Sequence, residues 1–272
     1  MQHRLGLIAG GGILPAEIIK FCVTSERPFL VIAIKNQTHP DIVSGDTPHK
    51  WFRMGAAGTI IEFLKTHEVK DLVMAGTMKR PSIFSLCPDL FAIKFFLRTG
   101  ASFLGDNGLL SNLTQVLHEE GFNVIAPNDL LPELVASKGA LGLIEPNERD
   151  KIDITAGIKA ALEIGCQDLG QAAIARNGEV IGTEDNKGTD FLLSTIKRCK
   201  DLSHNGVLVK VAKPGQEIRA DLPTIGPLTV SNAVTAGLSG IAIQSGMSLI
   251  LDQRETLKLA NDNGIFIFGV NI

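Results

Sequence analysis

The sequence lacks the patterns that mark several large classes of protein. No apolar run approaches the roughly 20 residues that a helix needs to span a bilayer. No run of lysine and arginine supplies the basic face that duplex nucleic acid requires. The four cysteines are scattered without a Cys-x-x-Cys pair, which is typical of a reduced protein with buried thiols. We therefore expect a cytoplasmic protein that binds no nucleic acid.

Several catalytic patterns are missing as well. The six histidines show neither His-x-His nor His-Glu-x-x-His spacing, so the sequence does not support a zinc site. No serine stands in a Gly-x-Ser-x-Gly elbow, and there is no Gly-x-x-x-x-Gly-Lys-Ser/Thr phosphate loop. The candidates for chemistry are therefore glycine-rich loops and groups of carboxylates and cations.

The first half of the chain alternates apolar runs of strand length with segments of helical spacing. The predicted strands are Arg4–Ala9, Phe29–Ile34, Asp71–Gly76 and Phe122–Ala126, and the predicted helices are Pro15–Thr24, Ala56–His67, Pro88–Arg98 and Leu109–Glu120. Continuous apolar strands in this alternation indicate a parallel sheet covered by helices on both faces. We expect residues 1–131 to form a Rossmann-like domain.

A shift in composition at Pro127–Pro132 marks the candidate linker to a second domain, residues 132–272. In that half Asn177-Gly178 predicts an antiparallel hairpin, because this dipeptide supplies the positive φ angles of a type I′ turn. The other predicted elements are strands at Val207–Ala212, Ile241–Gln244, Ser248–Leu251 and Ile265–Val270, and helices at Asn147–Ile164, Thr189–Lys200, Thr229–Leu238 and Gln253–Asn261. Together they predict a mixed α/β domain.

Gly10, Gly11 and Gly12 follow the first predicted strand and precede the first predicted helix. Such a loop lets backbone N–H groups meet a phosphate at a helix N-terminus, although a tight structural turn needs glycine equally. Pro15 stands where a dinucleotide fingerprint has its third glycine, and the second strand ends at Lys35 without the acidic residue of an NAD site. An NAD-dependent oxidoreductase is therefore disfavoured.

The loop Lys213–Gly226 concentrates charge between a predicted strand and a helix for which Thr229 is the expected N-cap. It contains the cations Lys213 and Arg219 and the carboxylates Glu217 and Asp221. A polar surface loop would explain the composition, but strand-to-helix loops at the carboxyl edge of a sheet are also where α/β proteins place ligands.

The residues from Lys213 onward, Lys-Pro-x-Gln-x-x-Arg-x-Asp-Leu-Pro-Thr-Ile-Gly, resemble the signature of the LpxI family, the UDP-2,3-diacylglucosamine pyrophosphatases of bacterial lipid A biosynthesis. The resemblance extends over nearly the whole chain, through Gly10–Gly12 with Leu14-Pro15, Ala75-Gly76 with Arg80-Pro81, Gly105-Asp106-Asn107 and Gly188-Thr189-Asp190. It implies cleavage of UDP-2,3-diacylglucosamine to UMP and 2,3-diacylglucosamine 1-phosphate, at an active site between two domains.

The same resemblance implies the roles of individual residues. Asp221 is expected to be the key acid and a ligand of Mg²⁺ or Mn²⁺, with Arg219 as a catalytic cation and Asp190 as a further metal ligand. Substrate contacts are expected from Gly10, Gly11, Gly12, Gly76, Thr77, Lys79, Arg80, Asp106, Gly188, Thr189, Lys213, Gln216 and Thr224.

Simpler interpretations stand beside several of these roles. Lys79 and Arg80 fit a solvated basic loop, Asp106 fits a helix N-cap, and Asp190 fits an acid in a first helical turn. The chain also departs from the pattern of the family that it resembles, with Asn107 and Lys187 standing where acidic residues are expected.

Apolar and aromatic side chains are dense from Phe84 to Phe103, beside Lys94 and Arg98. Core packing explains such a stripe, while an acyl-chain groove or a peripheral contact with the inner face of the membrane is the functional interpretation. A non-catalytic carrier of a nucleotide-linked lipid remains the alternative function. The sequence does not define an oligomeric state.

Overall fold

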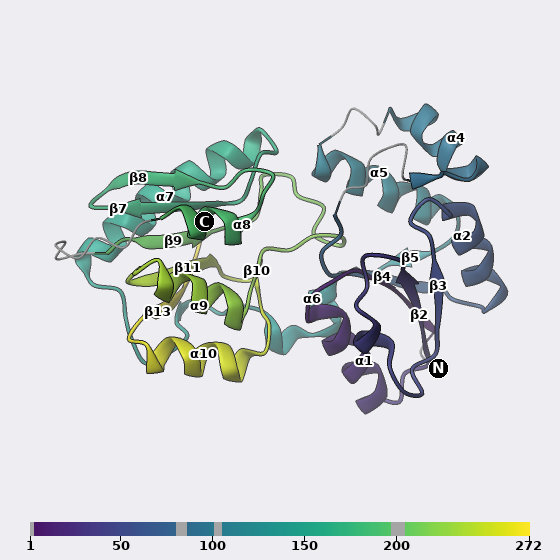
Figure 1. Ribbon diagram of the computed structural model, residues 1–272, viewed down its shortest axis with the longest axis horizontal. Coiled ribbons are helices and arrows are strands. Elements are labelled where there is room, and N and C mark those ends of the chain that lie inside the picture. Colours follow the sequence, from purple (N-terminus) through teal and green to yellow (C-terminus); the bar gives the residue numbers. More distant parts are fainter. Residues whose placement is uncertain (1–2, 80–85, 101–104, 197–204) are drawn as a thin grey trace. The chain divides into compact units, whose positions relative to one another are not determined.

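The computed structural model describes residues 3–79, 86–100, 105–196 and 205–272. The chain divides into two compact units (Figure 1). The N-terminal unit comprises Met1–Pro132 together with Glu217–Asp221, and the C-terminal unit comprises Glu133–Gln216 and Leu222–Ile272. Arg80, Phe84 and Phe103, which the sequence analysis singled out, lie outside the described residues.

The N-terminal unit is built on a five-stranded parallel sheet with the order β3-β2-β1-β4-β5. Its strands are β1 (Leu5–Ala9), β2 (Phe29–Ile34), β3 (His49–Phe52), β4 (Asp71–Ala75) and β5 (Asn123–Val124). Its helices are α1 (Leu14–Thr24), α2 (Ala57–Thr66), α4 (Leu90–Thr99), α5 (Asp106–Glu119) and α6 (Pro127–Leu130), with a 3₁₀ turn η1 (Pro40–Val43). This order confirms the predicted Rossmann-like sheet.

The strands of this sheet are apolar on both faces because helices cover both. On one face Ile60 and Leu64 of α2 and Leu117 of α5 pack against Ile32 and Leu72. The alternate strand residues point to the opposite face, as the period of two in a strand requires. Such residues, for example Leu7 and Val31, are fully buried as well.

Two features of this half were not predicted. The two units change over at Pro132, at the predicted boundary, but the candidate linker Pro127–Pro132 contains a helical turn, α6, whose Pro127 and Leu130 are buried in the N-terminal unit. Strand β3 was not predicted at all, because only Phe52 of its four residues is buried and the run carries no continuous apolar pattern.

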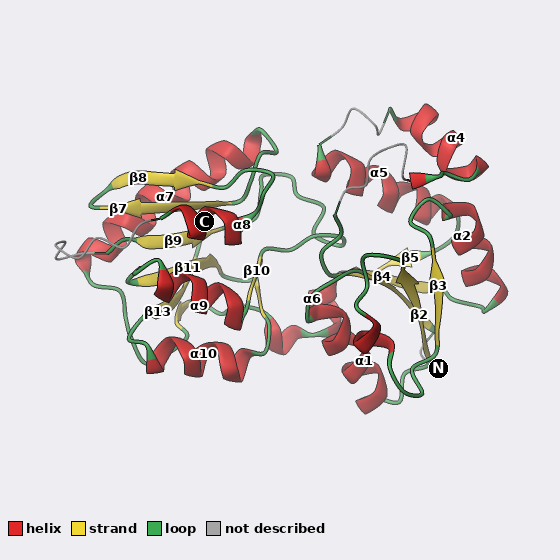
Figure 2. Ribbon diagram, viewed as in Figure 1, coloured by secondary structure: helices red, strands yellow, loops and turns green. Residues whose placement is uncertain are grey.

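The C-terminal unit is built on a six-stranded mixed sheet with the order β6-β13-β11-β9-β7-β8. Its strands are β6 (Gly139–Ala140), β7 (Ala172–Arg176), β8 (Glu179–Thr183), β9 (Val207–Lys210), β11 (Gly240–Gln244) and β13 (Phe266–Val270). A separate parallel pair joins β10 (Thr224–Ile225) to β12 (Leu249–Ile250). Figure 2 shows the strands of both units in yellow. The predicted mixed α/β fold is confirmed.

Helices cover both faces of the six-stranded sheet. Helix α7 (Glu148–Cys166) packs on one face, where Ile154 and Ala161 meet Val209 of β9. Helices α8 (Thr189–Thr195), α9 (Pro227–Thr235) and α10 (Gln253–Asp262) cover the other face. A short 3₁₀ turn, η3 (Pro132–Leu134), lies where the N-terminal unit ends.

Two local predictions for this half had different outcomes. Asn177 and Gly178 have φ angles of 53° and 78°, so the β7–β8 hairpin is confirmed with the expected turn. The N-cap prediction for Thr229 was wrong, because α9 begins two positions earlier at Pro227 with Gly226 as its cap. Proline favours the first turn of a helix because it has no N–H to leave unpaired.

Candidate functional site

The glycine-rich loops after β1 and β4 cross at the carboxyl edge of the N-terminal sheet. Gly11 N–H donates to the Thr77 carbonyl at 2.8 Å, and Thr77 N–H donates back to Gly11 at 2.9 Å. Gly10 N–H donates to the Ala75 carbonyl at 2.8 Å. The backbone donors of Gly10, Gly11 and Thr77 are therefore already used within the fold.

Glycine is required at this crossing for two different reasons, close contact with another backbone segment and a positive φ angle. A Cβ on Gly76 (φ 91°) would lie 2.4 Å from the Gly11 carbonyl oxygen, and one on Gly10 would lie 2.6 Å from the Thr77 oxygen. Gly12 (φ 86°) instead has nothing within 4 Å of the place that a methyl carbon would occupy, so its glycine is required by conformation alone.

The N-terminus of α1 is the part of this loop with donors to offer. No hydrogen bond within the described chain uses the N–H of Gly12, Ile13 or Leu14. These groups point out of the first turn of an eleven-residue helix, where the helix dipole favours an anion. Of the three glycines expected to contact a phosphate, Gly12 alone keeps its backbone donor.

Two side chains that the sequence analysis missed hold the loops after β1 and β4. Thr38 is buried; its hydroxyl donates to the Ala9 carbonyl at 2.5 Å and accepts from Ile34 N–H at 2.8 Å. The Gln37 amide brackets the main chain of Lys79, accepting from its N–H at 2.8 Å and donating to its carbonyl at 3.1 Å. The Lys79 side chain is left exposed.

The segment that carries Asp221 belongs to the N-terminal unit. Glu217 N–H donates to the Asn107 side-chain oxygen at 2.8 Å, and Ala220 packs against the core beneath α2 and α5. Asp221 is half-buried, and its N–H donates to the Glu217 carbonyl at 2.9 Å. Asn107, where an acid was expected, thus accepts a backbone hydrogen bond at the start of this segment.

Arg219 forms a forked ion pair with Glu217. Its Nε and Nη2 donate to the two carboxylate oxygens at 2.7 and 2.6 Å. These hydrogen bonds from Arg219 hold the pKa of the Glu217 carboxyl below its usual range. The pair stiffens the turn immediately before Asp221, and it occupies part of the guanidinium that was expected to serve as a catalytic cation.

Lys213 and Gln216 are engaged within the C-terminal unit. Lys213 Nζ lies 2.7 Å from Oδ1 of Asp168, and only 11% of the Lys213 side chain is exposed. Gln216 accepts from Lys213 N–H at 2.7 Å and donates to Gln171 at 3.3 Å. The charge of Lys213 is therefore neutralised by a carboxylate that the sequence analysis did not single out.

The region Glu184–Asp190 is organised around a buried carboxylate. Glu184 accepts from the Thr189 hydroxyl at 2.6 Å and from Gln171 N–H at 2.7 Å. Asp190 lies in the first turn of α8, is exposed, and accepts from Asn232 at 2.9 Å. Gly188 (φ 87°) caps the same helix. The hydroxyl of Thr189, an expected substrate contact, is thus used internally.

Lys187, which departs from the family pattern, lies on the surface. Its ammonium is 4.3 Å from the centre of the Phe191 ring, a cation–π contact. Asp106 is the first residue of α5 and Gly105 holds the cap position, so the prediction of Asp106 as N-cap was wrong. Thr224 is half-buried, and its carbonyl accepts from Lys210 Nζ at 3.0 Å.

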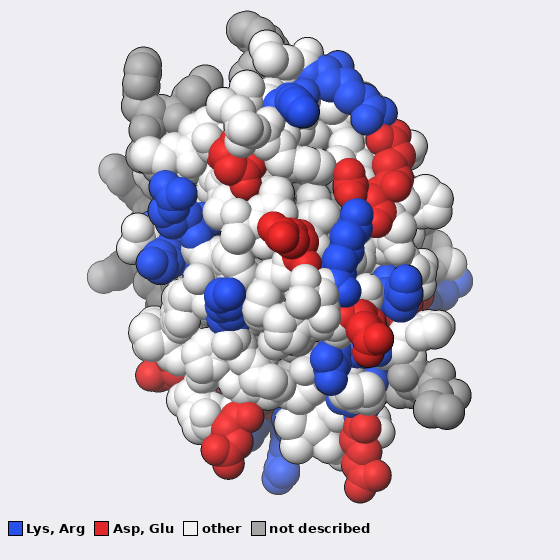
Figure 3. Space-filling view, turned by 90° about the vertical axis from the view of Figure 1, so that its right-hand side faces the viewer, with Lys and Arg blue, Asp and Glu red and all other residues white. Residues whose placement is uncertain are grey.

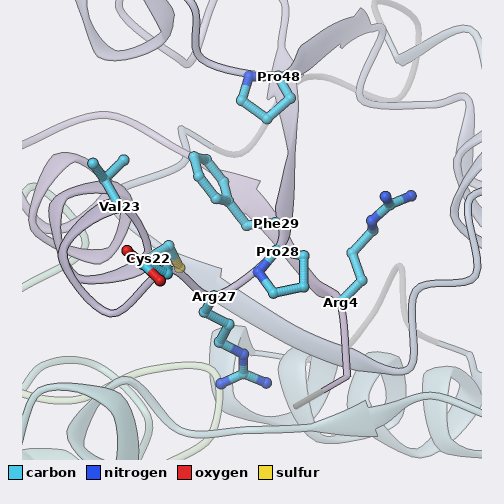
Figure 4. A pocket seen from close by; sticks show the side chains of 8 residues that line it. Arg4, Cys22, Val23, Arg27, Pro28, Phe29 and Pro48 are labelled. Carbon is cyan, nitrogen blue, oxygen red and sulfur yellow. The ribbon is translucent and has the colours of Figure 1, made fainter. Parts of the chain in front are cut away.

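A hollow at the amino-terminal edge of the N-terminal sheet is a poor candidate for the site. Arg4 and Arg27 line it together with Phe29 (Figure 4). Arg27 pairs with Asp71 at 2.6 Å, and Arg4 donates to the His67 carbonyl at 2.9 Å. Both guanidinium groups thus bind other groups of the N-terminal unit, at the edge of the sheet opposite the glycine loops.

The arrangement defines a two-domain α/β protein with candidate sites on loops that follow its strands. Residues 4–134 match the family model of the LpxI N-terminal domain, and residues 137–268 match that of the LpxI C-terminal domain. The chain is also 33% identical, over 99% of its length and 98% of the relative, to the UDP-2,3-diacylglucosamine pyrophosphatase LpxI of Caulobacter vibrioides. The chain belongs to the LpxI family, as its motifs predicted.

Proposed function

We propose that this protein hydrolyses the pyrophosphate of UDP-2,3-diacylglucosamine, releasing UMP and 2,3-diacylglucosamine 1-phosphate. The observation that carries the proposal is the 33% identity to a pyrophosphatase of that name across 99% of the chain. Both family domains are matched, so the likeness is not confined to a shared Rossmann-like half.

The reaction requires an activated water, charge neutralisation on two phosphates, and stabilisation of a phosphate leaving group. We assign Asp221 as the key acid, because it lies half-buried in a tethered turn beside the Glu217–Arg219 pair. The N–H groups of Gly12, Ile13 and Leu14 and the exposed ammonium of Lys79 are suited to a phosphate.

A divalent cation, Mg²⁺ or Mn²⁺, completes the proposal and would supply charge neutralisation at the phosphates. The described residues contain no group of three or more His, Cys, Asp or Glu side chains placed to hold a metal. Magnesium commonly binds through one or two carboxylates together with substrate phosphates. Asp221 fits such a ligand, and Asp190 keeps one carboxylate oxygen outside its bond to Asn232.

The test is UMP release from UDP-2,3-diacylglucosamine with Mg²⁺, with Mn²⁺ and with chelator. We expect metal-dependent turnover by the wild type and a loss of about 10³-fold or more in Asp221→Ala. Asp41→Ala, which removes an exposed carboxylate of the same unit, is the matched control. Tight binding without turnover would identify a carrier instead, and turnover retained in Asp221→Ala would exclude Asp221 as the key acid.

We further propose that the enzyme is cytoplasmic and touches the inner membrane through α4. Leu90, Ile93 and Leu97 lie at helical spacing and are 78%, 41% and 81% exposed. The exposed Lys94 adds a charge that suits anionic lipid. Phe95 and Phe96, by contrast, are half-buried. Among the described residues, every helix is too short or too polar to reach across a bilayer.

Co-sedimentation with vesicles of anionic phospholipid tests this contact. Leu90→Glu with Leu97→Glu should abolish pelleting, whereas Val23→Glu, at an apolar position of α1 that is 64% exposed, should not. Equal pelleting of all three proteins would remove α4 from the proposal. On the side of the molecule in Figure 3, acidic and basic side chains are interspersed with uncharged surface.

A further inference from the structure

Lys210 is a buried cation that pairs with no carboxylate among the residues that the structure describes. It is the last residue of β9, is 9% exposed, and donates from Nζ to the Thr224 carbonyl at 3.0 Å. Nothing else in the described chain takes a hydrogen bond or an ion pair from its ammonium. An ammonium has three donor hydrogens, so two are left for another acceptor.

Glu184 is a buried acid on the same sheet, and its carboxylate is hydrogen-bonded to other groups. Lys210 lies opposite Ala172 in the β9–β7 pairing, and Glu184 N–H bonds to the Ala172 carbonyl from the other side. The two charged side chains therefore flank the small side chain of Ala172, on the face of the sheet that α8 and α9 cover. The Glu184 oxygens accept from Thr189 and Gln171 instead of from Lys210.

Satisfying one carbonyl does not require a charge. The backbone of β12 bonds to the carbonyls of Pro223 and Ile225, which leaves the Thr224 carbonyl facing the other way. A neutral donor could complete that hydrogen bond without the cost of burying an ammonium. The charge of Lys210 is then best explained by an anion that binds there.

We propose that Lys210 binds a phosphoryl group of the nucleotide diphosphate, held in place by the Thr224 carbonyl. Lys210 stands at the carboxyl end of β9, three residues before Lys213, where the charged loop begins. Lys213, the cation that the sequence favoured for this task, is already neutralised by Asp168. The identity of the anion rests on the proposed function, whereas the presence of an anion site does not.

The experiment measures UDP binding by calorimetry and UDP-2,3-diacylglucosamine turnover for four proteins. Lys210→Gln keeps a donor but loses the charge, Lys210→Arg keeps the charge, and Lys258→Gln removes an exposed lysine of the same unit. Because a hydrogen bond to a charged group is the stronger kind, we expect UDP affinity to fall about 10- to 100-fold in Lys210→Gln. Lys210→Arg should stay within several-fold of the wild type, and Lys258→Gln should match it.

A second measurement needs no folded variant. In wild-type protein labelled with ¹⁵N at the lysine Nζ, UDP should shift the Lys210 resonance and leave that of Lys258 in place. Wild-type affinity in a folded Lys210→Gln protein, or no movement of the Lys210 resonance, overturns the inference. Binding of UDP through Lys210 without turnover would reject the proposed function and leave the anion site standing. Unchanged turnover in Lys210→Gln would leave the proposed function standing and would reject the anion site at Lys210.

Discussion

The crossing of the two glycine loops gives the sharpest test of the N-terminal unit. Gly12 and Gly76 both have positive φ, 86° and 91°, but only Gly76 faces another backbone. An alanine in the left-handed region costs about 1–2 kcal/mol, and the more restricted unfolded chain returns about 0.4–1 kcal/mol. Gly12→Ala should therefore lower the free energy of unfolding by roughly 1 kcal/mol.

Gly76→Ala carries the same conformational cost and adds a steric one. Its Cβ would lie 2.4 Å from the Gly11 carbonyl oxygen and 3.0 Å from Pro15 Cγ. The main chain at Gly76 or at Gly11 would therefore have to move. Overpacking of this kind typically costs about 1–3 kcal/mol more. We expect Gly76→Ala to be less stable than Gly12→Ala by about 2 kcal/mol.

Urea unfolding followed by fluorescence and circular dichroism measures this difference, with the single Trp51 in β3 as the probe. Equal losses in the two variants would refute the close crossing of the loops. The same proteins separate structure from binding, because a methyl at Gly12 lies beside the free donors of α1 and should weaken UDP binding while the fold persists.

Three further predictions concern individual side chains. Asn107→Ala should lower stability by about 1–2 kcal/mol in urea unfolding, because Glu217 N–H loses its acceptor, and Asn107→Asp should not. Because the pKa of Glu217 is lowered in the folded protein, its ion pair stabilises the fold at pH values above the ordinary glutamate pKa, and this stabilisation is lost as the pH falls through the depressed pKa. Glu217→Gln removes the titrating group, so its free energy of unfolding should depend less on pH in the acid range than that of the wild type. Burial raises the pKa of Cys22 to about 11, so at pH 8 the exposed Cys87 and Cys166 should react with a thiol reagent much faster than Cys22.

The fold was predictable where the sequence pattern is local. The continuous apolar runs of β1, β2 and β4 and the Asn177-Gly178 turn were recognised because each carries its own signal. Strand β3 was missed because its pairing with β2, and not its composition, makes it a strand. The turn α6 was taken for a linker because a proline stands at each end of Pro127–Pro132, although the fold buries Pro127 and Leu130.

The candidate site was predictable as a set of residues but not as a set of partners. Lys213 meets Asp168 across 45 positions, and Glu217 meets Asn107 across 110. Lys210 was read as part of an apolar strand, and only its burial beside the Thr224 carbonyl distinguishes it. Which cation is neutralised and which still has donors depends on long-range contacts that residue spacing does not encode.

The placement of Glu217–Asp221 in the N-terminal unit has a consequence for how the protein can be divided. A fragment that ends near Pro132 would lack Ala220, which belongs to its own core, together with the turn that holds Asp221. Such a fragment would show a defect in its hydrophobic core, and a synthetic peptide spanning the missing turn should restore it in trans. The N-terminal unit thus depends on a segment that the chain supplies from within its second half, and any attempt to recombine LpxI domains between species would have to keep that segment with the unit it completes.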